Sequence, residues 1–68
     1  MIKFETDGGN EGVNVYLDSE GIIELISYLN FIQNQDDHMH LIAGNELSEE
    51  QSLEGCTTVK HVKLMFLS

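Results

Sequence analysis

One stretch of helical apolar spacing, flanked on both sides by segments of alternating polarity, constrains the fold of this chain most strongly. Within residues 22–32, apolar side chains recur at intervals of three or four positions: Ile22, Leu25, Ile26, Leu29 and Ile32. This spacing predicts an amphipathic helix. Asp18 or Ser19 can accept hydrogen bonds from the free N–H groups of its first turn. We therefore expect a helix that begins at residues 18–19 and ends within residues 34–37.

Alternating polarity predicts four strands around this helix, at residues 2–5, 13–17, 38–43 and 58–67. The turn-forming residues 6–12 predict a hairpin loop, and residues 44–57 form a long polar loop. For 68 residues, this order predicts a single α+β domain over 1–68. The fold is ββαββ, a four-stranded, mainly antiparallel sheet with one helix on one face. A strand order of 1-2-4-3 would make every neighbouring pair antiparallel.

The same alternation assigns the strand side chains to two sides of the sheet. The side facing the helix is expected to hold the core residues Ile2, Phe4, Val13, Val15, Leu17, Met39, Leu41, Val62, Leu64 and Phe66. The other side is expected to be open and to display Lys3, Glu5, Asn14, Tyr16, His38, His40, Ile42, His61, Lys63 and Met65.

The charge balance excludes two classes of partner. Twelve acidic residues face three lysines, without any arginine, so the net charge is −9. Such a chain repels nucleic acid and anionic membranes, whose binding depends on lysine and arginine. It is attracted to basic surfaces, although acidity can also serve solubility alone. Part of this charge lies in the polar loop, at Glu46, Glu49, Glu50 and Glu54.

The sequence gives little sign of catalysis or of a cofactor. Residues 8–12 are rich in glycine, but they lead into a strand, whereas a phosphate-binding loop leads into a helix. Cys56 is the single cysteine, and nearby Glu54 is expected to raise its pKa and make it less reactive. A lone cysteine fits a reducing compartment, and we find no leader or membrane-spanning segment. We expect a cytoplasmic, non-enzymatic protein without a cofactor.

Three histidines allow more than one interpretation. His38 and His40 are two positions apart on a strand, and His61 falls on the same side of the last strand. If the two strands pair, the imidazoles could form a ligand set that zinc can use, or a group that titrates near neutral pH. They could equally be solvated or contact a partner.

The open side of the sheet is the better candidate for function. It combines aromatic, apolar and polar groups, as protein interfaces do. The candidate partner-binding residues are Tyr16, His38, His40, Ile42, His61, Lys63 and Met65. A homodimer could form through the same side of the sheet.

Four short segments resemble the immunity protein 32 family of bacterial polymorphic toxin systems. They are VYLDSEG at 15–21, HMHL at 38–41, GNEL at 44–47 and HVKL at 61–64. The resemblance implies that the chain neutralises a cognate toxin by direct contact. A basic toxin domain is the expected partner, and the structural homodimer and the histidine-based metal-binding protein are the alternatives.

Overall fold

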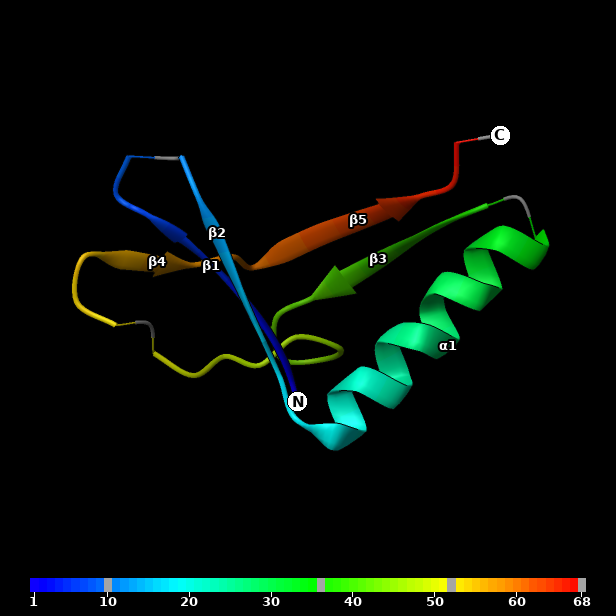
Figure 1. Cartoon of the computed structure of the whole chain (residues 1–68), viewed down its shortest axis with the longest axis horizontal. Helices are drawn as coiled ribbons and strands as arrows, with labels where there is room; N and C mark the ends of the chain where they lie inside the picture. The colour runs from blue at the N-terminus through cyan, green and yellow to red at the C-terminus, as the bar shows by residue number, and fades with distance from the viewer. Residues whose placement is uncertain (10, 36, 52, 68) are drawn as a thin grey trace.

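The computed structural model describes residues 1–9, 11–35, 37–51 and 53–67, and these residues form an α+β arrangement of one helix and five strands (Figure 1). Asn10 of the expected hairpin loop and Asp36 at the expected helix end lie outside the described residues. In chain order, the elements are β1 (Ile2–Asp7), β2 (Val13–Leu17), α1 (Ser19–Gln35), β3 (His38–Ile42), β4 (Cys56–Thr58) and β5 (His61–Met65).

The strands form two antiparallel sheets, so the expected single four-stranded sheet is wrong. β2, β1 and β4 form a three-stranded sheet in that order, and β3 pairs with β5 in a second sheet. The strand order 1-2-4-3 is also wrong, because β1 rather than β2 lies next to the last part of the chain. In Figure 1, the first sheet lies on the left, and the β3–β5 pair extends to the right above α1.

A change of partner at Val59 and Lys60 produces the two sheets. The expected strand 58–67 corresponds to β5 and to Thr58 alone of β4, whose first two residues fall in the expected polar loop. The Val59 N–H still donates to the Phe4 carbonyl on β1 at 2.9 Å, whereas the Lys60 carbonyl accepts from the Ala43 N–H beyond β3, also at 2.9 Å. One extended segment therefore pairs with β1 at its start and with β3 at its end.

The start of α1 is fixed by a cap and by close backbone packing. The Asp18 carboxylate accepts a hydrogen bond from the Gly21 N–H at 2.7 Å, which satisfies a free donor of the first turn. Gly21 is buried, and a Cβ atom added there would lie 1.9 Å from the Met1 carbonyl oxygen. Only a residue without a side chain allows this approach between the helix and the first residue of the chain.

The core is small, and it includes a residue that alternation did not assign. Ile2, Leu41 and Leu47 are buried together. Half-buried side chains that pack around them are Phe4, Leu17, Leu25, Tyr28, Met39, Val62 and Leu64. Leu47 reaches the core because the chain turns back at Gly44, whose φ of 85° favours glycine, and Leu47 N–H donates to the Ile42 carbonyl.

Several residues expected in the core are instead exposed. Val13 and Val15 on β2, and Phe66 beyond β5, are exposed. The expected helical stripe is covered only in part: Ile32 is buried, as expected, together with Gly21. Leu25 packs with the core as expected, whereas Ile22, Ile26 and Leu29 are exposed. A single helix therefore covers only part of the two sheets.

The close approach at Gly21 predicts that Gly21→Ala destabilises the fold. The methyl group would overlap backbone atoms that cannot rotate away, so we expect the free energy of unfolding to fall by about 2 kcal/mol or more. Gly9→Ala is the control, because its added Cβ meets the nearest atom, Asp7 Oδ1, at 3.8 Å. In urea denaturation, the free energy of unfolding of this control should lie within about 0.5 kcal/mol of that of the parent chain. Equal stability of the two variants would contradict the packing.

Candidate functional site: a histidine face and a buried carboxylate

The residues expected on one open side of a sheet lie in two separate places. His38, His40, Ile42, His61, Lys63 and Met65 are exposed on the β3–β5 pair, and we call this group the histidine face. Tyr16 belongs instead to β2, in the other sheet, where it lies opposite Lys3 of β1. The structure therefore brings six of the seven candidate partner-binding residues onto one two-stranded sheet and leaves Tyr16 apart from them.

The three imidazoles of the histidine face form a row. His40 Nδ1 and His61 Nε2 are 2.7 Å apart, and the two rings stack with centroids 4.9 Å apart. His38 meets His40 edge-on, with ring centroids 5.1 Å apart. In the β3–β5 register, His38 lies opposite Met65 and His61 opposite Ile42, so His40 lies between the other two histidines.

The row does not converge on one point as a three-histidine metal site does. Within residues 1–9, 11–35, 37–51 and 53–67, no group of three or more His, Cys, Asp or Glu residues is arranged to hold a metal ion. His38 and His61 approach His40 from different ends of the sheet. The metal-binding alternative therefore rests on two neighbouring imidazoles, and catalytic zinc sites use three protein ligands.

The hydrogen bond between His40 and His61 requires that at least one of the two rings is neutral, since a doubly protonated pair has no acceptor. The pKa of His40 lies below 6.5. Reduced hydration is the largest cause, followed by the charges of His61, His38 and Lys63. The centre of the histidine face is therefore uncharged near neutral pH.

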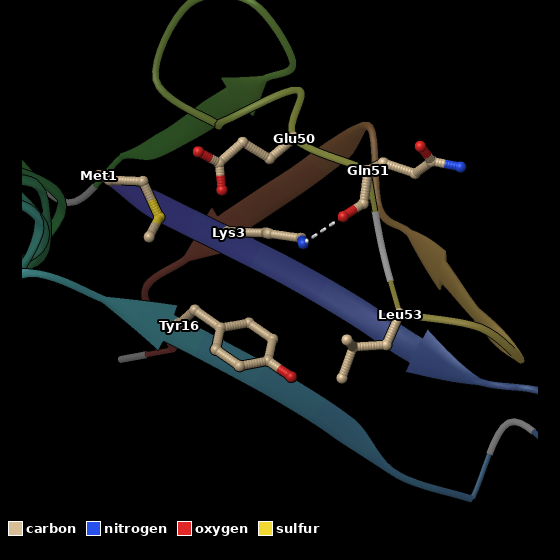
Figure 2. Close-up of a pocket in the computed structure, with 6 residues that line it drawn as sticks. All are labelled: Met1, Lys3, Tyr16, Glu50, Gln51 and Leu53. Atoms are coloured by element: carbon tan, nitrogen blue, oxygen red, sulfur yellow. Dashed lines mark hydrogen bonds between the residues drawn. The ribbon is translucent and has the colours of Figure 1, made fainter.

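The other part of the expected open side is covered, which corrects the assignment of Lys3 and Glu5 to an exposed surface. Glu5 is fully buried, and Lys3 is 8% exposed. Residues 48–51 and Leu53 lie over this side of β1, and Lys3 Nζ donates to the Gln51 carbonyl at 3.1 Å (Figure 2). Nothing in the strand pattern indicated this cover, because it comes from the long polar loop.

Glu5 is the centre of a buried polar cluster. Its Oε1 accepts hydrogen bonds from the Tyr16 hydroxyl at 2.8 Å and from Asn14 Nδ2 at 3.1 Å. Its Oε2 lies 3.8 Å from Lys3 Nζ. The Cys56 thiol also donates to this carboxylate. A buried carboxylate needs such partners, because removal from water is costly for an unpaired charge.

The cluster keeps its neighbouring acids protonated. The hydrogen bond to Glu5 is the largest cause that raises the pKa of Tyr16, and partial burial adds to it. Partial burial is the largest cause that raises the pKa of the Cys56 thiol, followed by the charge of Glu5 and the hydrogen bond to it. A thiol held in its protonated form is a poor nucleophile. The chemistry of this cluster is therefore structural rather than nucleophilic.

Two shallow hollows accompany the polar loop. The first has a volume of about 200 Å³ and is open to Lys3 and the Tyr16 ring, with Lys3 Nζ 5.5 Å from the ring centroid. Figure 2 shows the six residues that line it: Met1, Lys3, Tyr16, Glu50, Gln51 and Leu53. The second has a volume of about 320 Å³ and is lined by Ala43, Glu49, Thr58 and Lys60. Pockets that bind small molecules usually have volumes of about 300–1,000 Å³. The first hollow is smaller than this range, and the second lies at its low end.

The acidic loop residues have different environments. Glu46 is half-buried, and its Oε1 accepts a hydrogen bond from the Ile42 N–H at 3.1 Å, so it closes the turn after β3. Glu49, Glu50 and Glu54 are exposed. The acidic loop thus offers three free carboxylates to a partner and uses the fourth to hold its own shape.

The Glu5 cluster predicts that Glu5→Gln destabilises the fold. The neutral amide leaves buried Lys3 without its counter-charge and replaces one acceptor oxygen by a donor. We expect the free energy of unfolding to fall by roughly 1–3 kcal/mol. Glu11→Gln makes the same chemical change at an exposed position and should stay within about 0.5 kcal/mol. Urea denaturation measures both, and an unchanged stability of Glu5→Gln would refute the role of the cluster.

The imidazole row predicts the pH dependence of His40. Because its folded pKa is lowered, this group contributes stability that is present above pH 6.5 and lost as the pH falls through the lowered pKa. His61→Gln removes the imidazole that stacks on His40 and should move the His40 pKa up towards 6.5. NMR titration of the imidazole protons measures the His40 pKa in the parent chain and in the variant. A His40 pKa at or above 6.5 in the parent chain would contradict the row.

No protein-family model, curated protein or solved structure matches this chain. The resemblance to the immunity protein 32 family therefore stays a prediction. α1 lacks the length and apolar character of a helix that crosses a bilayer, and the described residues contain no other candidate.

Proposed function

We propose that this chain is a small, acidic, non-enzymatic binding protein that captures a basic protein, as an immunity protein captures a toxin domain. The observation that carries the proposal is the distribution of charge on the folded surface. Four short segments resemble the immunity protein 32 family, and this resemblance indicates that the partner is a toxin domain. Neither a cofactor nor a reaction is part of this proposal.

The surface of the folded chain has a larger excess of acidic over basic side chains than the composition indicates. Nine acidic side chains are exposed in the described residues: Asp7, Glu11, Asp18, Glu20, Glu24, Asp37, Glu49, Glu50 and Glu54. Of the three lysines, Lys60 and Lys63 are exposed, whereas Lys3 is buried beside Glu5. A surface of this kind attracts a basic partner over long range and accelerates association.

The histidine face and the acidic loop together form the proposed contact surface. Ile42 and Met65 are 44% and 58% exposed on the histidine face, so they can supply the apolar centre of an interface. The His40 imidazole beside them has a lowered pKa and is uncharged near neutral pH. Glu49 lines a hollow with Ala43 and Lys60, which adjoin β3 and β5, and its carboxylate supplies a charged rim. An apolar centre with a polar rim is the usual anatomy of a protein interface.

The proposal predicts a complex that weakens with salt. The test is isothermal titration calorimetry of the chain against the basic protein encoded beside it. We expect the dissociation constant to rise about tenfold or more between 50 and 300 mM NaCl, because salt screens the attraction. Glu49→Gln should weaken the complex more than Glu11→Gln, which removes the same charge from the β1–β2 hairpin. Absence of binding, or binding that salt does not change, would refute the proposal.

A further inference from the structure

Two imidazoles at the centre of the histidine face are bonded to each other and not to an acid. His40 Nδ1 and His61 Nε2 are 2.7 Å apart, and Lys63 lies opposite His40 in the β3–β5 register. Among the described residues, no carboxylate forms an ion pair with either ring. The charges that act on His40 are those of His61, His38 and Lys63, which are all cationic when charged. A proton added to the pair therefore brings a positive charge that no neighbouring acid balances.

His38, the third imidazole of the face, has a different environment. Its Nδ1 lies 3.1 Å from the carboxylate of Asp37, the residue before it in the chain. A proton on His38 therefore forms an ion pair with an acid that is already in place. When the pH falls, His38 adds less net charge to the histidine face than the His40–His61 pair does.

The acids of the surrounding elements do not face the pair. α1 packs against the opposite side of β3 and β5, where the core lies, so Glu20 and Glu24 are on the far side of this sheet. In the turn after β3, the Glu46 carboxylate accepts a backbone hydrogen bond at 3.1 Å. Glu49 lines a hollow together with Lys60. A doubly protonated pair thus remains a positive site on an otherwise acidic molecule.

We infer that the His40–His61 pair is a pH-sensitive switch, in which protonation of both rings breaks their hydrogen bond and makes the basic partner dissociate. The inference rests on the proposed function and adds the condition under which the complex comes apart. A pair that holds two protons has no acceptor, so the rings must separate. The two cations then lie beside Lys63 and oppose a basic surface, and like charges that face each other across an interface weaken it strongly.

The neutral pair is the form that binds, and mildly acidic solution should abolish it. Reduced hydration, and then the neighbouring cations, lower the pKa of His40, so this ring is neutral at about pH 7.5 and gains its proton only in acidic solution. Carboxylic acids ordinarily titrate near about pH 4. Most of the acidic surface therefore keeps its charge at about pH 5.0, and the change between these two pH values belongs mainly to histidine.

NMR of the free full chain tests the pair without a partner. The nuclear Overhauser effect between the carbon-bound ring protons of His40 and His61 should be strong at pH 7.5 and several-fold weaker at pH 5.0. Dispersed amide signals at pH 5.0 should show that the fold is retained. Three results would overturn the inference: rings that are not adjacent at pH 7.5, rings that stay adjacent at pH 5.0, or a chain that unfolds at pH 5.0.

Isothermal titration calorimetry with the basic protein tests the effect on binding. At constant salt, we expect the dissociation constant to rise about tenfold or more from pH 7.5 to pH 5.0. The double variant His40→Gln/His61→Gln should lose most of this rise, because the acids of the chain and the groups of the partner titrate as before. Absence of binding at pH 7.5 would refute the proposed function and this inference with it. A dissociation constant that is equal at both pH values would overturn this inference alone.

His38→Gln is the matched control, since it removes an imidazole from the same face and leaves the pair intact. It should keep most of the rise in dissociation constant between pH 7.5 and pH 5.0, because Asp37 balances the charge of His38. If His38→Gln lost the pH dependence and the double variant kept it, the pair would not be the switch, and the inference would be overturned.

Discussion

At Val59 and Lys60 the extended chain leaves β1 and joins β3, and the rest of the structure follows from this change of partner. The backbone hydrogen bonds at these two residues point to different sheets. The two sheets can therefore diverge, and α1, which contacts strands of both, covers only part of each. The histidine face then lies on the β3–β5 pair, while the Glu5 cluster lies on β1 and β2. The apolar residues left exposed on α1 and β2 are a further consequence.

The pairing of buried Lys3 with Glu5 links the fold to the proposed function. It removes one of three lysines from a surface that already has a large excess of acids. The loop that covers this pair also carries Glu49 and Glu50 at its exposed rim. A single segment thus closes the polar cluster on one side and presents carboxylates on the other.

Alternation and helical spacing located β1, β2, α1, β3 and β5 to within a few residues, because each depends on local sequence, but they assigned most of β4 to the polar loop. They also placed His38, His40 and His61 on a common face correctly. They could not place the break at Val59 and Lys60, since both halves of that segment alternate alike. They could not show that the polar loop covers Lys3 and Glu5, or that Leu47 enters the core, because long-range contacts decide both.

The histidine face as the docking surface is the central claim, and chemical-shift mapping tests it most directly. In a two-dimensional ¹H–¹⁵N NMR titration with a basic protein that binds this chain, the perturbed amides should lie on β3, β5 and residues 46–49. The amides of Ile22, Ile26 and Leu29 on α1 should stay unperturbed. Perturbations centred on Ile22, Ile26 and Leu29, with β3 and β5 unchanged, would contradict the account.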